Sequence, residues 1–368
     1  MFKIASLDAF GISVPLKKTV TTASGSVTTA DNLIIRMADM DGTVGWGEAP
    51  CAPAMMGETH VGMVAAAQYM ATKLEGAETP EHADFHSLVN CAMYGNNGAK
   101  AAIEIAMLDI AGKRVGKPLY ELLGGSARTH ATMLTFVAGG TLENEVANAK
   151  SQADAGFTSF KVKVGVNAPQ RDLERAHAIR EALGSGARIS ADANQGYTPD
   201  EALDFAKGAT DAGLDFMEQL VMGTDLESMA RCAAATEVPL GADEGYHSIG
   251  DIQRHHDVKA AAGGSLKTLK LGGAFPVLEA SKLMNTLGMH VNLAGKLADT
   301  SIGSAAIAHL AIAVPQLDWD TSITNQYLAD DVVTDPILIR EGRISLSDAP
   351  GLGVTPSEVA LTKYTTIR

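Results

Sequence analysis

From about residue 129 onward, short apolar runs alternate regularly with amphipathic stretches, and this alternation limits the folds open to the chain. The apolar runs have the length and composition of strands, from residues 129–137 to residues 289–295. Amphipathic stretches such as residues 169–183 and 198–213 predict helices between them. At least seven such units in series predict an α/β fold built as a (β/α) barrel, because an open doubly wound sheet would require its strand order to reverse.

The first part of the chain lacks this rhythm and predicts a separate α+β domain. Its expected strands and helices lie at residues 4–14, 32–49, 61–74 and 98–115. After about residue 318 the rhythm decays into short strand and turn segments. We therefore expect three parts: an α+β domain over residues 1–125, a barrel over residues 126–318, and a tail over residues 319–368 that packs back on the first domain.

Composition and charge exclude several classes of protein. A net charge of −14 argues against a nucleic-acid binder and against adhesion to an anionic membrane. The three cysteines are scattered and form no CxxC pair, so neither a disulfide framework nor a zinc site is predicted. No apolar run approaches the roughly 20 residues that span a bilayer, and the N-terminus lacks the features of a signal peptide. We expect a soluble, cytoplasmic protein.

Three acidic residues mark the ends of three successive predicted strands. Asp192, Glu218 and Asp243 are 26 and 25 residues apart, which is about one strand–helix unit each. Barrel enzymes place their catalytic groups at the C-terminal ends of strands, so the three carboxylates should converge on one mouth. Their mutual repulsion calls for a cation, and all-oxygen ligation suits Mg²⁺. For any one of these residues the alternative is a loop position or a helix N-cap.

Lysines flank this series of carboxylates on the neighbouring strands. Lys163 lies one unit before Asp192, and Lys267 lies one unit after Asp243, so a barrel places these two lysines on opposite sides of the cation. Lys161 points to the same strand face as Lys163, and its ammonium together with Mg²⁺ would lower the pKa of Lys163. Two such lysines could remove and deliver the α-proton of a carboxylate substrate. The alternative for Lys161 and Lys163 is a solvated sheet face.

These residues and their neighbours resemble the enolase superfamily, and within it the muconate-lactonizing enzyme subgroup. The resemblance covers nearly the whole chain: VGWGEA, NNGAKAAIEIAMLDIAGK, KVKVG, DANQGY, MEQL, ADEG, LKTLKLGG and PGLGV occur in the family's order. It implies a modified TIM (β/α)7β barrel, with an α+β N-terminal capping domain completed by the C-terminal tail. It also implies one Mg²⁺ per subunit and a symmetric homo-oligomer.

The resemblance assigns roles residue by residue. It implies that Asp192, Glu218 and Asp243 bind Mg²⁺, that Lys163 and Lys267 form the acid/base pair, and that Lys161 holds the substrate carboxylate. Asn194 and Glu244 would orient the metal ligands. In the KxxKxGG motif the first lysine is the family's catalytic one, so Lys270 is expected to be structural.

The chain departs from the family at several positions. The usual EQP is here EQL, with Leu220. Asp299 stands in the predicted last barrel strand, where the family often has Glu, and the DxD motif that dipeptide epimerases use there is absent, which argues against that activity. His290 lies in the seventh barrel strand, where another subgroup carries a catalytic histidine. Because Lys267 already occupies the sixth strand, we expect His290 to be structural.

Two loops of the capping domain, at residues 19–29 and 51–60, are expected to select the substrate. Their side chains are small or apolar and include no arginine for a second carboxylate, which disfavours muconate and dicarboxylic sugar acids. The expected substrate contacts are Lys161, Asp299, Thr22, Ser24, Met55 and Trp319. Asp299 could hold a cationic nitrogen, and Trp319 could offer a cation–π platform. The alternative for Trp319 is a core aromatic.

A small, proline-like zwitterion fits these hints, and the whole sequence is similar to proline-type members of the superfamily. The first hypothesis is dehydration of cis-3-hydroxy-L-proline to Δ1-pyrroline-2-carboxylate. The second is racemisation or 2-epimerisation of a proline betaine or another N-substituted amino acid, as the main reaction or as a side activity of the same site. Cycloisomerisation ranks below these. A non-catalytic barrel also ranks below them, because a degraded barrel usually loses a metal ligand or a lysine.

Overall fold

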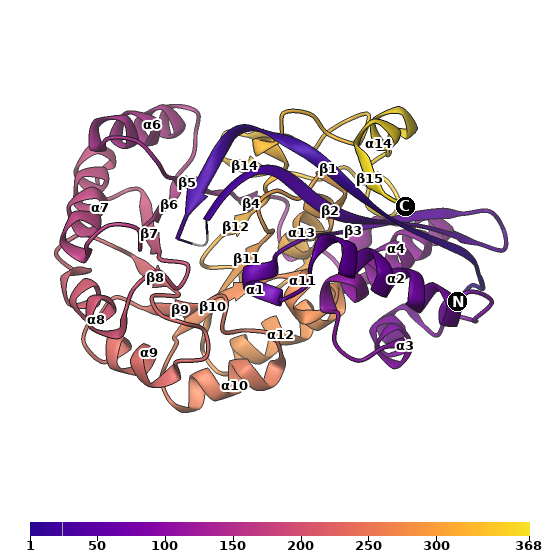
Figure 1. Cartoon of the computed structure of the whole chain (residues 1–368), viewed down its shortest axis with the longest axis horizontal. Coiled ribbons are helices and arrows are strands. Elements are labelled where there is room, and N and C mark those ends of the chain that lie inside the picture. The colour runs from indigo at the N-terminus through magenta and orange to yellow at the C-terminus, as the bar shows by residue number, and fades with distance from the viewer. Residues whose placement is uncertain (24) are drawn as a thin grey trace.

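A computed structural model describes residues 1–23 and 25–368 and shows two domains side by side (Figure 1). The capping domain contains a four-stranded sheet in the order β15-β1-β2-β3. Its N-terminal elements are β1 (Ile4–Thr22), β2 (Gly25–Asp39), β3 (Val44–Pro50), α1 (Pro53–Met56), α2 (His60–Leu74), the 3-10 helix η1 (His82–Asp84), α3 (Phe85–Ala92), α4 (Asn97–Val115) and α5 (Leu119–Leu122). The hairpin of β1 and β2 reaches from this domain across to the second one.

The second domain is a parallel sheet of eight strands in the order β12 to β5, surrounded by helices. Its strands are β5 (Leu134–Val137), β6 (Ser159–Lys163), β7 (Arg188–Asp192), β8 (Phe216–Glu218), β9 (Leu240–Ala242), β10 (Gly263–Leu266), β11 (His290–Ala294) and β12 (Thr321–Ser322). Its helices are α6 (Leu142–Asp154), α7 (Pro169–Leu183), α8 (Pro199–Gly208), α9 (Leu226–Ala233), α10 (Ile249–Asp257), α11 (Thr268–Leu271), α12 (Ala274–Thr286) and α13 (Ser301–Ala313). Ser322 donates to the carbonyl of Leu134 at 2.7 Å, which brings the last strand back to the first. The predicted (β/α)7β barrel is confirmed.

The C-terminal segment contributes to both domains. Its elements, with the short strand β4 (Ala131–Thr132), are the 3-10 helix η2 (Asn325–Tyr327), β13 (Ile339–Arg340), β14 (Arg343–Ile344), α14 (Glu358–Tyr364) and β15 (Thr365–Ile367). Because β15 pairs with β1, the tail completes the capping sheet, as the resemblance implied. The barrel's last strand, β12, lies beyond residue 318, where the sequence pattern placed the end of the barrel.

Local sequence explains how a helix packs on a strand in the capping domain and how a barrel helix begins. Helix α4 lies directly on β3, because Gly45 and Gly47 expose bare backbone there. A Cβ added to Gly47 would lie 1.9 Å from the carbonyl oxygen of Ala102, so a larger residue would separate the helix from the strand. Thr198 begins α8 with a capping box that it shares with Glu201.

One strand prediction is wrong in detail. Residues 265–273, SLKTLKLGG, were expected to continue as a strand, but β10 spans Gly263–Leu266 and the chain then turns into helix α11. Lys267 has an extended backbone and precedes the first residue of that helix. The turn places Lys270 behind the mouth of the barrel rather than along a strand.

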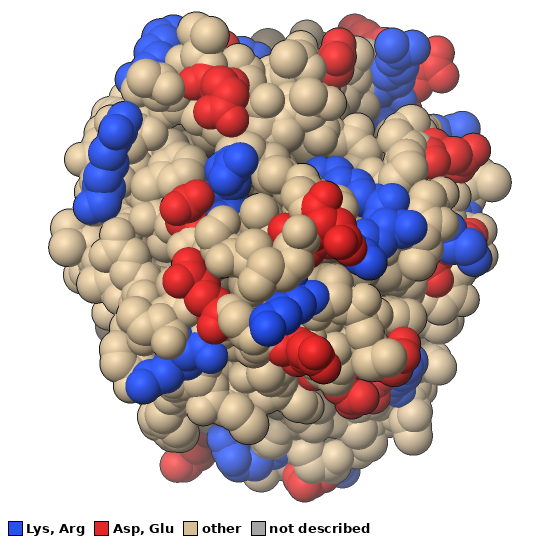
Figure 2. Space-filling model, turned by 90° about the vertical axis from the view of Figure 1, so that its right-hand side faces the viewer, with Lys and Arg blue, Asp and Glu red and all other residues tan. Residues whose placement is uncertain are grey.

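Charge is distributed evenly on the face of the capping domain turned toward the viewer in Figure 2, where basic and acidic side chains are interspersed rather than gathered by sign. No helix among the described residues is long and apolar enough to cross a membrane.

Candidate active site

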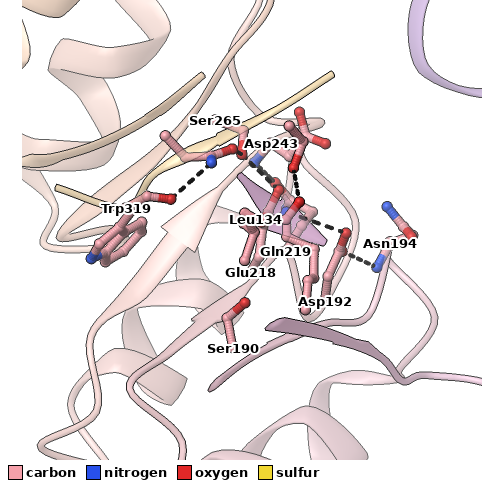
Figure 3. Close-up of polar contacts among 12 residues, drawn as sticks. Leu134, Ser190, Asp192, Asn194, Glu218, Gln219, Asp243, Ser265 and Trp319 are labelled. Atoms are coloured by element: carbon pink, nitrogen blue, oxygen red, sulfur yellow. Dashed lines mark hydrogen bonds and ion pairs between the residues drawn. The ribbon is translucent and has the colours of Figure 1, made fainter. Parts of the chain in front are cut away.

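The strand ends bring the predicted carboxylates and lysines to one mouth. Lys163 and Asp192 occupy paired positions at the ends of β6 and β7, and Asp192 in turn pairs with Glu218 at the end of β8. Asp243 and Lys267 directly follow β9 and β10. All five side chains therefore come from consecutive strands, in the order that the spacing predicted. Figure 3 shows the three carboxylates and Asn194 at these strand ends.

Each carboxylate is held by at least one ammonium group. Lys163 donates to Asp192 at 2.6 Å and to Asn194 at 2.9 Å. Lys161 donates to Glu218 and lies 3.9 Å from Asp192. On the opposite side, Asp243 accepts from Lys267 at 2.5 Å. The two predicted acid/base lysines thus lie on opposite sides of the carboxylate cluster, bound to its two ends.

Lys270 is the second ammonium at Asp243. Its Nζ donates to the Asp243 carboxylate at 2.6 Å, to the Asp243 carbonyl at 2.5 Å and to the carbonyl of Ser265 at 2.8 Å. The side chain is fully buried, and its three donors are all used. These contacts agree with the structural role expected for Lys270.

Ion pairing, rather than burial, determines the charge state of this cluster. Burial raises the pKa of Asp243, but Lys267 and Lys270 outweigh it and leave that pKa well below its usual range. The pKa of Asp192 is lowered in the same way by Lys163 and Lys161. Burial lowers the pKa of Lys267, but Asp243 outweighs it and that pKa is raised. The mouth therefore holds ionised carboxylates and ammonium groups together.

The donor set fits a hard divalent cation in its chemistry. Asp192, Glu218 and Asp243 are buried carboxylates at adjacent strand ends, and all-oxygen ligation is what Mg²⁺ prefers. Among the described residues, no group of three or more acidic, histidine or cysteine side chains is arranged so that it could hold a metal ion without rearrangement. The reason is visible in the contacts: ammonium groups already bind the oxygens that the cation would need.

Asn194 and Glu244 connect the two sides of the cluster. The Asn194 amide donates to Glu244 at 3.1 Å, and its backbone N–H donates to Asp192 at 2.9 Å. Burial, together with the charges of Asp243 and Asp192, raises the pKa of Glu244 to about 8. With its pKa at about 8, Glu244 adds little charge beside the ionised carboxylates, and it accepts from Asn194, which in turn binds Asp192.

Sequence reasoning missed Gln219 and Ser265, which fix the carboxylates from below. The Gln219 side-chain oxygen accepts from the backbone N–H groups of Asp243 at 2.9 Å and Gly245 at 3.1 Å. Ser265 donates to Glu218 at 2.8 Å. The position of Gln219 directly after Glu218 in the EQL motif was the available signal, whereas Ser265 had no comparable signal.

A cavity of about 260 Å³ opens above these residues. Its floor includes Lys161, Lys163 and Lys267, while its roof comes from the capping domain and includes Met55, one of the expected substrate contacts. Apolar residues dominate the remaining wall, namely Val20, Val27, Leu134, Phe136 and Leu297. Of the other expected contacts, Ser24 lies outside the described residues, and so does the side chain of Thr22.

Trp319 and Asp299 do not line this cavity, so the contacts expected for them are corrected. Trp319 precedes β12 and stacks on Phe216, with ring centroids 4.1 Å apart, and on His290 at 5.0 Å. Phe216 and His290 begin their strands, so this aromatic stack closes the opposite end of the barrel. Trp319 is the core aromatic of the alternative interpretation, and the site of His290 agrees with a structural role.

Asp299 is buried between the domains. A Cβ on Gly295 or Gly303 would meet its carboxylate or its side-chain stem, and its nearest acidic neighbour is Glu48 of the capping domain. Burial and the charge of Glu48 raise the pKa of Asp299 well above its usual range. Asp299 is absent from the cavity lining, and its raised pKa disfavours the charged form that would hold a cationic nitrogen.

Lys296 is the cavity residue that sequence reasoning missed. It lies two residues after β11 and lines the same cavity as Lys161, Lys163 and Lys267. The strand end was considered only for Asp299, and the lysine three residues earlier was the available signal.

A barrel with carboxylates and lysines on five successive strand ends, roofed by an α+β domain, defines the fold and site of an enolase-type enzyme. Two family models support this: the N-terminal domain of mandelate racemase and muconate lactonizing enzyme matches residues 7–124, and the enolase C-terminal domain-like model matches residues 144–360. The chain therefore belongs to the mandelate racemase/muconate lactonizing enzyme family of the enolase superfamily.

Relatives within the family include isomerases of several kinds. The chain is 31% identical to the L-Ala-D/L-Glu epimerase of Bacillus subtilis (strain 168), with 96% of each chain covered. It is 27% identical to the N-succinyl-L-Arg/Lys racemase of Bacillus cereus, over 99% of this chain and 98% of that one. Its structure matches that of a muconate lactonizing enzyme from Pseudomonas fluorescens with a TM-score of 0.94 and 27% identity, covering 99% of this chain and 100% of the other.

Proposed function

We propose that this protein removes and returns the α-proton of a small carboxylate, with Lys163 and Lys267 as the two proton-transfer groups. One observation carries the proposal: the two ammonium groups flank the same carboxylate cluster from opposite sides and face one cavity. Opposite placement lets one lysine take a proton from one face of the α-carbon while the other delivers a proton to the other face.

The remaining residues of the mouth have supporting roles in this proposal. Asp192, Glu218 and Asp243 would hold Mg²⁺, which stabilises the negative charge that develops on the substrate carboxylate. Lys161 would bind that carboxylate, since it lies on the same strand face as Lys163. Release of Lys163 and Lys267 from their present partners would free them to act on the substrate.

For the overall reaction we propose racemisation or 2-epimerisation of an N-substituted α-amino acid. The support comes from the site and from the family together. Return of the proton to the opposite face gives an isomerase, and the relatives named above are epimerases, racemases and a muconate lactonizing enzyme. This reaction requires no leaving group in the substrate and no further acid beyond the two lysines.

Dehydration of cis-3-hydroxy-L-proline is retained as a second proposal, because the compact, mainly apolar cavity would accept a five-membered ring. One lysine would take the α-proton, and the other would protonate the departing 3-hydroxyl, which leaves as water. The resulting enamine tautomerises to the cyclic imine.

A symmetric homo-oligomer also stays a prediction, which light scattering would test.

Proton exchange in D₂O tests the proposal and separates its two forms. Protein with Mg²⁺ is incubated with cis-3-hydroxy-L-proline and with L- and D-forms of N-acylated amino acids, and deuterium at the α-carbon is followed by mass spectrometry. Deuterium incorporation with inversion supports an isomerase, whereas a cyclic imine supports a dehydratase. Absence of both across the panel would refute the proposal.

The assignment of the two lysines is tested with single variants. Lys163→Ala should lose exchange from one enantiomer and Lys267→Ala from the other, by about 10²- to 10⁴-fold, because each removes the proton-transfer group of one face. Lys207→Met, which changes an exposed lysine of α8, is the matched control. Equal loss of both enantiomers in both variants would argue against two lysines acting on opposite faces.

A further inference from the structure

Lys296 differs from the other lysines of the cavity in having no acidic partner. Lys161, Lys163 and Lys267 each form an ion pair with a carboxylate of the mouth. Lys296 donates only to the backbone carbonyl of Leu297, at 2.8 Å. No acidic side chain among residues 1–23 and 25–368 lies within 4.0 Å of its ammonium group.

Burial lowers the pKa of Lys296, and the charges of Asp299 and Asp31 further away offset this only in part. Asp299 is the strongest of these acidic influences, but burial and the charge of Glu48 raise the pKa of Asp299 well above its usual range. The cavity that Lys296 lines has a mainly apolar wall, with Val20, Val27 and Leu134 among its residues. An ammonium group in a partly enclosed, apolar space is costly unless an anion accompanies it.

We propose that Lys296 binds a second anionic group of the substrate, so that the substrate is a compact α-carboxylate with a further carboxylate or similar anion. This inference rests on the proposed function, in which Lys161 and the cation at the mouth would bind the α-carboxylate. The second anion would then lie at Lys296. The second anion belongs either to the side chain or to the substituent on nitrogen. This inference differs from the expectation, drawn from the capping loops, that the lack of an arginine there disfavours substrates with a second carboxylate.

Matched pairs of simple acids test this recognition without knowledge of the substrate. Malonate, succinate and glutarate are compared with propionate, butyrate and valerate by calorimetric titration at saturating Mg²⁺. The best-fitting dicarboxylate should bind about 10- to 100-fold more tightly than its monocarboxylate, as expected for one additional charged hydrogen bond. Equal affinities for every pair in the wild-type protein would overturn the inference, and no variant is needed for that result.

Variants then assign the preference to this residue. Lys296→Met keeps the length of the side chain and should abolish the preference while leaving the monocarboxylate affinity unchanged. Lys296→Arg should restore most of it, and Lys207→Met, on exposed α8, should not alter it. A preference that survives in Lys296→Met would overturn the assignment. Circular dichroism confirms that the variants fold, and Lys296→Gln replaces the methionine variant if that one does not.

Proton exchange is measured separately, so that the two proposals fail in different ways. N-acetyl-L-glutamate and N-acetyl-L-glutamine differ in the second anion alone, and Lys296→Met should raise KM for the glutamate derivative with little change in kcat. If no exchange occurs with any substrate but the dicarboxylate preference depends on Lys296, the proposed chemistry is wrong and the anion site stands. If exchange occurs without such a preference, the inference about Lys296 is wrong.

Discussion

The mouth of the barrel and the seam between the two domains both bury carboxylates, but they compensate the charge in opposite ways. The mouth carboxylates are Asp192, Glu218 and Asp243; the seam carboxylates are Glu48, Glu104 and Asp299. Ammonium groups pair with the first set, and Asp192 and Asp243 have lowered pKa values. Among the described residues, no ammonium or guanidinium group lies within ion-pair distance of the second set, and burial raises the pKa of each member.

Helix N-termini take the place of lysines at the seam. Glu48 accepts from the backbone N–H groups of Thr300 at 2.8 Å and Gly303 at 2.7 Å, at the start of α13. Glu104 accepts from the N–H groups of Ala274 and Phe275, at the start of α12. Both glutamates belong to the capping domain, and both helices belong to the barrel. The seam carboxylates therefore join the domains, while the ion-paired mouth can exchange a lysine for a cation.

Metal removal should produce the largest difference between the two regions. Chelation with EDTA is expected to lower the rate of proton exchange by about 10³-fold or more, since the charge stabilisation lost amounts to several kcal/mol. Added Mg²⁺ should restore the rate and raise the thermal midpoint of the wild-type protein. The midpoint shift should vanish in Asp192→Asn but persist in Glu48→Gln. A shift that depends on Glu48 instead would place the cation at the seam.

Loss of one mouth carboxylate should destabilise the metal-free protein strongly. In EDTA, Asp243→Asn would leave Lys267 and Lys270 buried without their shared counter-charge, which costs about 3–5 kcal/mol of unfolding free energy. Urea unfolding measures this change. Asp204→Asn, which removes an exposed partner of Lys207, should cost no more than about 0.5 kcal/mol. Similar effects of the two substitutions would show that the mouth is not charged as described.

Unfolding free energy should depend on pH through Glu48. Burial raises its pKa from 4.5 to about 7, so the native protein keeps a proton that the unfolded chain releases. The resulting stabilisation is fully present below about pH 4.5 and is lost as the pH rises through about 7, with a size of at most about 3 kcal/mol. Glu48→Gln should flatten the profile between these values. The exposed Glu237→Gln is the control, and an unchanged profile in Glu48→Gln would contradict the assignment.

Much of the mouth was predictable because strand spacing and strand direction suffice to place it. Each strand–helix unit returns the chain to the same end of the barrel, so Lys163, Asp192 and Asp243 follow from their intervals alone. Trp319 was misplaced because its position depends on where the short strand β12 begins, and two-residue strands leave no pattern. A residue just before a barrel strand lies at the opposite end of the barrel, not at the mouth.

Long-range pairing accounts for most of what the sequence did not reveal. Glu48 and Thr300 are 252 residues apart, and Glu48 accepts from the backbone N–H of Thr300 at the start of α13. Nothing in the sequence around either residue indicates this contact. Lys296 follows a strand whose alternation was clear, but its direction depends on the turn after Ala294, where the pattern ends. The pattern in SLKTLKLGG looked continuous although helix α11 interrupts it.

The smallest expected effect concerns Glu104, and it tests whether the seam carboxylates are neutral. Burial raises the pKa of Glu104 to about 8, so at pH 6 the native group already carries a proton. Glu104→Gln should then change the unfolding free energy by about 1 kcal/mol or less, since an amide oxygen can still accept from Ala274. Glu104→Ala removes the acceptor and should cost about 1–2 kcal/mol for the lost cap alone.

The same variant should behave differently above pH 8. There the wild-type protein must ionise a buried carboxyl, and its unfolding free energy should fall, whereas that of Glu104→Gln should stay level. Urea unfolding of both proteins between pH 6 and about pH 9 measures the divergence. If Glu104→Gln instead costs several kcal/mol at pH 6, as Asp243→Asn is expected to do, then the helix N-terminus holds an ionised carboxylate. In that case backbone N–H groups would stabilise a buried charge here as well as lysines do at the mouth.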